Sequence, residues 1–434
     1  METIGQQLSV SEWQTFYPTV DLANACKKPA LQKVSQGYFC ERCESLSQVK
    51  VPAGFFYCPH CLSLGRMTSQ TFLYYFPAKK IAPRSVKLVW QGILSPAQEK
   101  IARKLVSDQA IGRTFLLWAV TGAGKTEMLF LLLKKFLEEG KRIAITAPRV
   151  DVCNELYLRF TQAFPQEAIS LFHGQEKKEA GDVFVICTVH QLLRYQNYFD
   201  LVIVDEVDAF PYAQDPLLIR AVGKAGQATG QRVYLSATPS PQLKKSVDRL
   251  YHLPARYHRR PLPVPQLLFD WRLKQRLLKA ELSKKAVVKL VELLDKNNLL
   301  LFCPSIPLLE KLSCYLQKKF PECQMTTVFA ADQERLVKVE NMRAGKYQLL
   351  LTTTILERGV TFENVSVVVL QASHRIFTQA ALVQIAGRAD RKGEYTQAEV
   401  IFITSEVTSA IKAAIKEIEE NNRQARAGGL IDAL

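Results

Sequence analysis

The chain has 434 residues, of which 48% are hydrophobic and 23% charged, so it can form two or three domains with their own cores and is not expected to be disordered. Its 57 Lys and Arg outnumber its 41 Asp and Glu. The resulting formal charge of +16 favours a polyanionic partner, nucleic acid or an acidic membrane surface, over a basic enzyme without such a partner. We expect a cytoplasmic chain, because the N-terminus lacks the pattern of a secretory signal and no apolar run reaches membrane-spanning length.

The N-terminal region contains two Cys-x-x-Cys pairs, formed by Cys40 with Cys43 and by Cys58 with Cys61. Each pair can place two thiolates on one tetrahedral ion, and the loop between the pairs is long enough to bring them together. We therefore predict a structural Zn²⁺ held by four thiolates, in a module of about residues 37–64 within an N-terminal region of residues 1–90. Four unrelated cysteines, or His60 as a substitute ligand, are the alternatives.

Residues 72–94 mix apolar, aromatic and basic side chains. Such a segment suits a strand pair that stacks bases and neutralises phosphates, and it equally suits an edge hairpin protected by lysines. Both interpretations stay open at this point.

A glycine-rich loop stands between an apolar run at residues 115–118 and a helical pattern at residues 128–137. It consists of Ala119, Val120, Thr121, Gly122, Ala123, Gly124, Lys125 and Thr126. Small residues allow backbone N–H groups to approach nucleotide phosphates closely. We expect Lys125 to reach the β and γ phosphates and Thr126 to offer its hydroxyl to Mg²⁺. The usual pattern begins with Gly, whereas this one begins with Ala119.

An acidic cluster follows the strand predicted at residues 201–204, at a sheet edge where ligands collect. Asp205 can hold Mg²⁺ through its water shell, and Glu206 can orient and deprotonate the water that attacks the γ phosphate. Asp208 is better placed to report the nucleotide state to neighbouring segments. A solvated acidic loop is the alternative, which the upstream Lys125 disfavours.

Helical patterns alternate with short β-rich runs, which predicts an α/β protein with two parallel sheets wrapped by helices. The predicted strands are residues 142–146, 183–187, 201–204 and 232–235, and then 299–302, 325–329, 348–351, 365–370 and 398–402. A Pro-rich segment separates the two series. The predicted domains are a first lobe at 91–240, a connector at 241–268 and a second lobe at 269–434.

Several further positions of the first lobe fit a nucleotide and a nucleic acid. Gln98 is a candidate for recognising adenine, and Arg149 follows a strand end where it can meet a phosphodiester chain. The segment 188–191 ends the next strand. Ser236 and Thr238 follow the strand after the acidic cluster, where their hydroxyls can switch partners when the γ phosphate leaves.

In the second lobe, Gly359 is expected to lie near the nucleotide. Arg388 and Arg391 are three residues apart, which places them on one face of a helix, and they can stabilise charge on the transferring phosphoryl group. Because the acids and the arginines belong to different lobes, hydrolysis would require closure and would produce relative motion.

This series of motifs resembles superfamily 2 helicases and translocases from Gln98 to Arg391. With the four-cysteine module in front, the whole chain resembles the ComFA family of bacterial competence proteins. The resemblance implies two RecA-like lobes, ATP and Mg²⁺, and a motor that helps to bring single-stranded DNA into the cell during natural transformation. It also implies a ComFC-like protein and the inner-membrane uptake channel as partners, and a cytoplasmic location or a peripheral one at the inner face of the membrane.

Two other functions were weighed against this one. The replication-restart helicase PriA also combines such a core with cysteine-bound zinc, but its cysteines lie within the helicase region, whereas here they precede Lys125. A nucleic-acid scaffold that binds ATP without moving is disfavoured by the presence of Glu206 and Arg388. The motifs predict neither the polarity of translocation, nor true strand separation, nor the oligomeric state.

Overall fold

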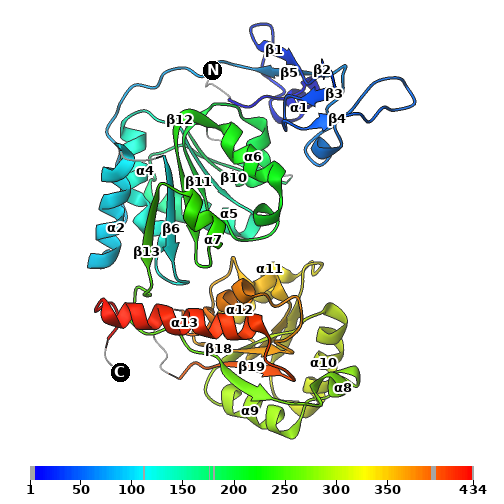
Figure 1. Cartoon of the computed structure of the whole chain (residues 1–434), viewed down its shortest axis with the longest axis vertical. Coiled ribbons are helices and arrows are strands. Elements are labelled where there is room, and N and C mark those ends of the chain that lie inside the picture. Colours follow the sequence, from blue (N-terminus) through cyan, green and yellow to red (C-terminus); the bar gives the residue numbers. More distant parts are fainter. Residues whose placement is uncertain (1–4, 111–112, 175, 179–180, 392–396, 433–434) are drawn as a thin grey trace. The chain divides into compact units, whose positions relative to one another are not determined.

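The structure, a computed structural model, describes residues 5–110, 113–174, 176–178, 181–391 and 397–432. The chain forms two compact units, which are Met1–Leu117 with Thr126–Tyr251 and Trp118–Lys125 with His252–Leu434. Each unit contains a large sheet built mainly from parallel strands, with helices packed on it (Figure 1). The predicted α/β architecture with two RecA-like lobes is therefore confirmed.

The sheet of the first unit has eight strands in the order β13-β6-β12-β11-β7-β10-β8-β9. Their bounds are β6 Thr114–Ala119, β7 Ile143–Ala147, β8 Ile169–His173, β9 Glu176–Lys178, β10 Phe184–Thr188, β11 Phe199–Val204, β12 Gly226–Ser236 and β13 Arg249–Leu253. β11 pairs in parallel with β7 and β12, and β10 pairs in parallel with β7 and β8. Parallel pairing brings the carboxyl ends of these strands to one edge of the sheet, where ligands of such folds bind.

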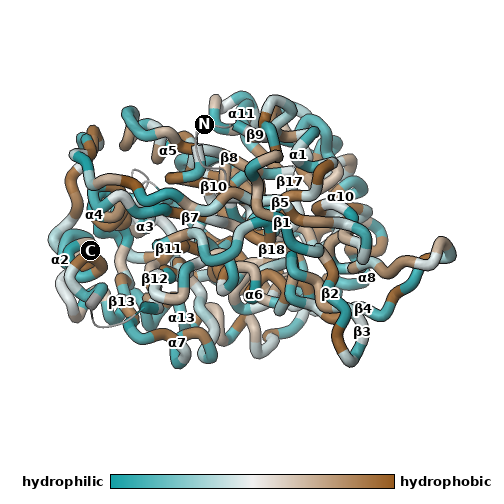
Figure 2. The backbone as a smooth tube through the Cα atoms, turned by 90° about the horizontal axis from the view of Figure 1, so that it is seen from above, coloured by the Kyte–Doolittle hydropathy of each residue, from teal (hydrophilic) through white to brown (hydrophobic). Residues whose placement is uncertain are grey.

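The central strands of this sheet are almost entirely apolar because they are buried on both faces. Every residue of β7 and of β10 is buried. The tube in Figure 2 is accordingly brown along β10 and β11. These runs were recognisable in the sequence, and the observed strands lie within a few residues of the predicted ones.

The helices of the first unit are α2 (Pro96–Ser107), α3 (Lys125–Met128), α4 (Phe130–Glu138), α5 (Val150–Ala163), α6 (Pro216–Ala225) and α7 (Pro241–Ser246). Short 3₁₀ turns also occur, among them η3 (Val189–Arg194). Several helices begin at side chains that cap their free N–H groups. Ser95 forms a reciprocal capping box with Gln98 at α2, and Asp215 accepts from the N–H of Leu217 at α6.

The N-terminal region consists of α1 (Val10–Phe16) and five short strands, β1 (Cys26–Pro29), β2 (Leu31–Val34), β3 (Gly37–Cys40), β4 (Leu46–Ser47) and β5 (Phe72–Tyr75). β1 pairs with β5, and β2, β3 and β4 form an antiparallel sheet. Figure 1 draws these elements in blue.

Neither interpretation of residues 72–94 is correct. Only Phe72–Tyr75 is a strand, and residues 76–94 form neither helix nor strand. This stretch runs past the end of α4, where Arg84 donates from its backbone N–H to the carbonyl of Glu138 at 2.9 Å and from Nη1 to that of Leu137 at 3.0 Å. Its apolar positions include the buried Val86, so the alternation reflects an extended segment laid on the unit.

The N-terminal region shares a hydrophobic core with the sheet of the first unit. Its buried members Leu31, Met67 and Leu73 belong to the same cluster as Leu193 of η3 and Ala221 of α6. The four cysteines of the two pairs are part of this cluster as well. Loss of order around the cysteines should therefore also disorder η3, which follows β10, and α6, which follows β11.

The sheet of the second unit has six strands in the order β14-β19-β18-β15-β17-β16, and the pairings between neighbours are parallel. The strands are β14 (Gln266–Phe269), β15 (Asn298–Phe302), β16 (Met325–Val328), β17 (Leu349–Thr352), β18 (Val365–Leu370) and β19 (Val400–Thr404). Their buried side chains on one face pack with residues of α8 (Leu273–Leu278), α9 (Lys284–Leu294) and α10 (Ile306–Lys319).

The remaining helices of the second unit are α11 (Arg335–Arg343), α12 (Gln379–Ala386) and α13 (Ser409–Ala427). α12 and α13 lie side by side (Figure 1). One face of α13 is buried at Ile411, Ala414 and Ile418. Among the described residues, no helix is both long enough and apolar enough to cross a membrane.

Candidate active site and metal centre

The predicted phosphate loop begins at the end of β6 and finishes where α3 starts. Gly122 and Gly124 have φ angles of 80° and 71°, which glycine adopts without steric strain. The ammonium Nζ of Lys125 donates to the carbonyl oxygens of Ala119 at 3.0 Å and Val120 at 3.5 Å. The lysine that is expected to reach the phosphates is thus folded against its own loop.

Within the second unit, the phosphate loop packs closely on the segment that follows α12. The Thr121 hydroxyl donates to the carbonyl of Gly387 at 3.4 Å. A Cβ atom at position 387 would lie 1.9 Å from Thr121 Oγ1, so only glycine allows this approach. The carbonyl of Gly122 accepts from the N–H of Tyr257 at 3.3 Å, which holds the loop from another side.

The acidic cluster lies at the carboxyl end of β11, as predicted. The N–H of Asp205 donates to the carbonyl of Thr146 at 2.7 Å, and Asp205 Oδ1 accepts from the N–H of Glu206 at 2.8 Å. Glu206 has a φ of 50°, an uncommon value for a residue with a Cβ atom. Its Oε2 atom is buried and has no hydrogen-bond partner among the described residues, so it is suited to bind a water molecule.

Asp208 connects this cluster to the end of the neighbouring strand β12. Its Oδ1 atom accepts from the Ser236 hydroxyl at 2.6 Å, and its Oδ2 atom accepts from the Thr238 hydroxyl at 2.5 Å. The N–H of Thr238 in turn donates to Ser236 Oγ at 2.9 Å. Both hydroxyls therefore donate to one carboxylate. A shift of the loop after β11 would change these bonds and so displace the segment after β12, and the reverse also holds.

Arg388 and Arg391 do not lie on a helix, so that part of the prediction is wrong. α12 ends at Ala386, and residues 387–390 form turns. The two side chains nevertheless reach one segment, because Arg388 Nε donates to the carbonyl of Glu357 at 3.0 Å and Arg391 Nη1 donates to that of Val360 at 3.1 Å. Gly359, with a φ of 76°, lies between these two carbonyls in the chain.

Sequence reasoning missed Arg256, which organises the same turns. This side chain is buried, and its Nη1 donates to the carbonyls of Ala389 and Asp390 at 2.9 and 2.8 Å, while its Nη2 donates to that of Gly387 at 3.0 Å. Burial lowers its pKa to about 10, against the opposing effect of Asp390. An arginine in a Pro-rich connector carries no local signal of such a role.

Gln98 is 2% exposed and its Oε1 atom accepts from the N–H of Ser95 at 2.7 Å. One side of the amide thus caps α2. Because Oε1 is used in this cap, any recognition of adenine by Gln98 would have to come from its Nε2 group.

Two segments that were predicted at strand ends do follow strands, namely the one with Arg149, which is expected to meet a phosphodiester chain, and residues 188–191. Arg149 directly precedes α5, and Thr188 directly precedes η3. Because β7 and β10 are parallel neighbours, the two segments leave the same edge of the sheet.

The four paired cysteines come together as predicted. Their sulfur atoms lie within 4.8 Å of one another, and all four residues are buried. Cys40 Sγ is 3.7 Å from Cys61 Sγ, and Cys43 Sγ is 3.4 Å from Cys58 Sγ. Neither distance fits a disulfide, whereas zinc–sulfur bonds of about 2.3 Å in a tetrahedron require sulfur atoms about 3.8 Å apart.

The surroundings of the cysteines also fit a thiolate-bound metal. His60 is exposed and does not belong to the group, which disfavours the alternative of a histidine ligand. A buried guanidinium, that of Arg42, stands in the chain between Cys40 and Cys43. Its Nε and Nη1 atoms have no hydrogen-bond partner among the described residues, so a positive charge is buried close in sequence to thiolate ligands. The cluster is thus consistent with Zn²⁺.

Comparison with known families defines the class of this protein. Residues 91–241 match the family described as "Type III restriction enzyme, res subunit", and residues 283–393 match the "Helicase conserved C-terminal domain". Together with the two RecA-like sheets, these matches identify an ATP-hydrolysing helicase of superfamily 2. Such an enzyme uses ATP and Mg²⁺.

Two relatives narrow the assignment further. The chain is 38% identical over 410 residues to competence protein ComFA of Streptococcus pneumoniae, and this match covers 92% of the chain and 94% of that protein. It is 41% identical over 378 residues to ComFA of Bacillus subtilis, which covers 85% and 81%. The chain belongs to the ComFA family of competence proteins.

Solved structures support the fold at a lower level of similarity. S. cerevisiae Dbp5 bound to RNA and ADP BeF3 superposes with a TM-score of 0.54 at 16% identity, over 78% of this chain and 93% of that one. RecG bound to a three-way DNA junction also gives 0.54, at 18% identity over 76% and 47%. At these identities the likeness concerns the arrangement of the sheets and helices.

Proposed function

We propose that this chain is an ATP-driven translocase on single-stranded DNA that serves DNA uptake in natural transformation. The observation that carries the proposal is the bonding of Asp208 to Ser236 and Thr238. In an ATPase of the ComFA family, this link gives a change at the acidic cluster a direct route to the next strand end. A motor needs such a route, whereas a scaffold that only binds ATP does not.

The nucleotide site of this proposal is assembled from the residues predicted in the sequence. Lys125 neutralises the β and γ phosphates, and backbone N–H groups of the loop from Ala119 to Thr126 surround them. Thr126 and Asp205 would hold Mg²⁺, which would offset phosphate charge in the bound nucleotide. Glu206 orients and deprotonates the attacking water, for which its buried Oε2 atom is suited.

Arg388 and Arg391 are proposed to act on the charge that develops on the transferring phosphoryl group. Their common contact with residues 357–360 means that both arginines move with that segment. Arg256 would then act indirectly, by holding the turns in which the two arginines lie. Gly359 allows the segment between the two carbonyl contacts to turn sharply.

The four cysteines are proposed to hold one Zn²⁺ as a structural metal, because four thiolates leave no open position for a substrate or water. On family membership we further propose a ComFC-like protein and the inner-membrane uptake channel as partners, with the protein in the cytoplasm at the inner face of the membrane. These partners can be tested by purifying the tagged chain from cells and asking whether both copurify with it. Deleting either partner from the cells should abolish the copurification of that partner.

The decisive experiment compares the ATPase rate at saturating single-stranded DNA, blunt duplex DNA and RNA. We expect the largest stimulation with single-stranded DNA, since a motor on one strand must follow one flexible backbone. Equal stimulation by blunt duplex, or stimulation by RNA alone, would leave a generic nucleic-acid motor. A rate unaffected by all three would favour the scaffold.

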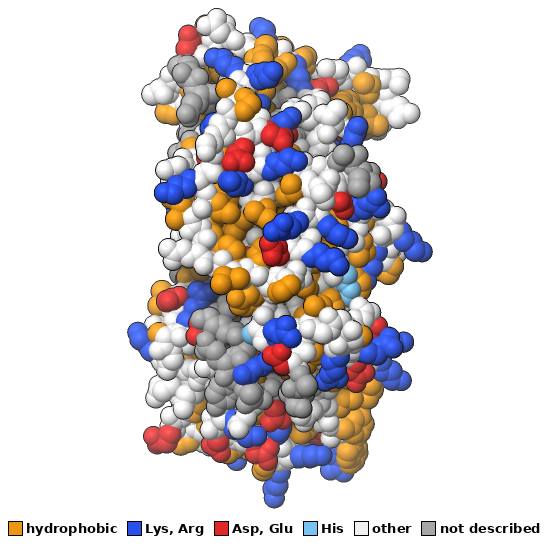
Figure 3. Space-filling view, turned by 90° about the vertical axis from the view of Figure 1, so that its left-hand side faces the viewer, with side chains coloured by type: hydrophobic (Ala, Val, Ile, Leu, Met, Phe, Trp, Pro, Cys, Tyr) orange, Lys and Arg blue, Asp and Glu red, His pale blue; other side chains and the backbone are white. Residues whose placement is uncertain are grey.

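Binding should depend on salt and not on base sequence. Thr, Arg and backbone groups contact phosphates and sugars, which position a strand without reading its bases. The charge of +16 adds a term that weakens as salt rises, because each neutralised phosphate releases counterions. Figure 3 shows Lys and Arg side chains spread over the face that it draws, with Asp and Glu among them. We expect affinity for a single strand to fall about 300-fold or more between 50 and 200 mM salt if six or more phosphates are contacted.

A further inference from the structure

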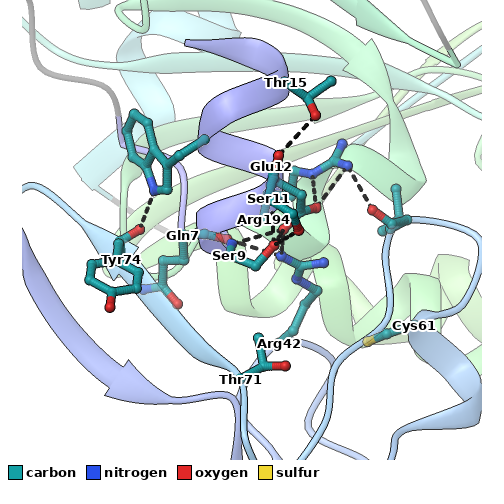
Figure 4. Close-up of polar contacts among 12 residues, drawn as sticks. Gln7, Ser9, Ser11, Glu12, Thr15, Arg42, Cys61, Thr71, Tyr74 and Arg194 are labelled. Atoms are coloured by element: carbon teal, nitrogen blue, oxygen red, sulfur yellow. Dashed lines mark hydrogen bonds and ion pairs between the residues drawn. The ribbon is translucent and has the colours of Figure 1, made fainter. Parts of the chain in front are cut away.

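A buried carboxylate in the N-terminal region binds two arginines at once. Glu12, in α1, accepts at Oε1 from Arg194 Nη2 at 3.1 Å and from Arg194 Nε at 3.3 Å. Its Oε2 atom accepts from Arg42 Nη2. The side chains of all three residues are at least nine-tenths buried, and Figure 4 shows them converging beside α1.

The two arginines belong to two different sites. Arg42 lies between the metal-ligand candidates Cys40 and Cys43, and Arg194 ends η3, which directly follows Thr188 at the carboxyl end of β10. Glu12 therefore joins the first cysteine pair to η3, which leaves the sheet at the same edge as the segment with Arg149, the residue expected to meet a phosphodiester chain.

Arg194 is also bonded to the loop that follows the second cysteine pair and to its own segment. Its Nη2 donates to the carbonyl of Leu64 at 2.9 Å, three residues beyond Cys61, and its Nη1 donates to the amide oxygen of Gln191. Gly65, with a φ of 132°, lets the chain pass Glu12 closely, since a Cβ there would lie 3.1 Å from Glu12 Oε1. Both cysteine pairs thus border the same buried charges.

The charge balance of this group depends on the metal site. Burial alone would raise the pKa of Glu12, but Arg42 and Arg194 outweigh it and lower the pKa, so the carboxylate stays ionised. One carboxylate facing two guanidinium groups leaves a formal charge of +1, and a buried charge without compensation is costly. Four thiolates with one Zn²⁺ carry a formal charge of −2. Because Cys43 directly follows Arg42 in the chain, a loaded metal site would add negative charge next to this group.

We propose that Glu12 is a positioning residue that couples metal binding at the four cysteines to nucleic-acid binding by residues 188–194. With the metal bound, Arg42 and the loop at Leu64 are held in place, and Glu12 and Arg194 transmit this order to Gln191. Without it, residues 188–194 lose their fixed attachment and bind a strand more weakly. This inference rests on the proposed function, and it adds the assumption that residues 188–194 contact the nucleic acid, because they leave the sheet at the same edge as the segment with Arg149.

The first measurement follows backbone amide hydrogen exchange of the full chain and needs no nucleic acid. Removal of zinc from the wild-type protein should raise exchange of residues 189–195 about fivefold or more, while β11 (Phe199–Val204) stays protected. Glu12→Gln should give the same increase with one zinc still bound, and zinc removal should then add less than twofold. Glu44→Gln, the same change at the exposed residue that directly follows Cys43, should behave like the wild type.

The second measurement uses thermodynamic reciprocity in the wild-type protein, so it does not depend on the folding of a variant. If zinc raises the affinity for a single-stranded oligothymidylate by a factor, the oligothymidylate must raise the affinity for zinc by the same factor. We expect a factor of about ten, within the usual range of coupling between sites. In Glu12→Gln the factor should fall to about one, and Glu12→Asp, which keeps the charge, should restore part of it.

Opposite results would overturn the coupling. Unchanged exchange of residues 189–195 after zinc removal, or independent effects of zinc removal and Glu12→Gln, would reduce Glu12 to a local structural contact. A wild-type protein that binds no single-stranded DNA would contradict the proposed function instead, and the exchange measurement would still decide whether Glu12 joins the metal site to residues 188–194.

Discussion

The Thr238 hydroxyl is bonded to Asp208 Oδ2 at 2.5 Å, so the end of β12 is attached to the acidic loop that follows β11. Ser236 bonds the other oxygen of the same carboxylate at 2.6 Å. A single side chain thus joins two parallel strand ends beside the proposed site of water activation.

Asp208→Asn should uncouple this link. The amide keeps the size of the side chain but can accept at one atom only, and a hydrogen bond to a charged group is stronger than a neutral one by about 1 kcal/mol. We expect DNA-stimulated ATP turnover to fall about tenfold or more, with a smaller loss of basal turnover. Steady-state ATPase assays with and without single-stranded DNA measure both. Asp295→Asn, at an exposed position after α9, serves as the control, and equal losses of both rates in Asp208→Asn would argue against a coupling role.

Lys125→Ala and Glu206→Gln should abolish hydrolysis for different reasons. Loss of Lys125 removes a cation from the phosphates, so nucleotide affinity should fall. Glu206→Gln should keep ATP bound but fail to activate water, and we expect at least a hundredfold loss of turnover with near-normal ATP affinity. Nucleotide titration and turnover of each variant separate the two effects. Near-normal turnover of Glu206→Gln would show that the acidic cluster has been assigned wrongly.

Arg388→Ala and Arg391→Ala should lower turnover much more than ATP affinity, since the two groups act on charge that develops during the reaction. Losing one such donor typically costs about 10²–10³ in rate. Arg423→Ala, which removes an exposed arginine paired with Glu420 on α13, is the matched control and should be neutral. If both variants retained normal DNA-stimulated turnover, their proposed catalytic role would be refuted.

Cys58→Ala should remove the metal and disturb more than the N-terminal region. The four cysteines share a hydrophobic cluster with η3 and α6, so we expect a lower melting temperature of the first unit together with weaker DNA binding. Cys314→Ala, at an exposed cysteine of α10, should be silent. Metal analysis of protein purified without chelator should give one zinc per chain, and its absence would contradict the zinc assignment.

Most of the fold could be read from local patterns. The buried strands β7, β10, β11, β15 and β18 are mostly apolar runs, and the sequence predicted each within three residues. In the two large sheets, β8, β9, β13 and β14 were missed. β14 is an edge strand with exposed Leu267 and Phe269, so its burial pattern does not distinguish it from the Pro-rich segment in front of it. The helix predicted for Arg388 is wrong because α12 ends at Ala386, directly before Gly387, whose close packing on Thr121 leaves no room for a side chain.

By itself, the sequence determined the chemistry of this protein. Gly122, Lys125, Asp205 and the four cysteines are recognisable because phosphate binding, acid–base catalysis and zinc coordination each need particular groups at short, fixed spacings. The tertiary structure alone decided how these groups are supported. Arg256 reaches the turns after α12, Asp208 bonds Thr238, and Glu12 bonds Arg194 although 182 residues separate them. Such pairs leave no periodic trace in the chain, because a buried charge or hydroxyl takes whichever partner the fold brings within reach.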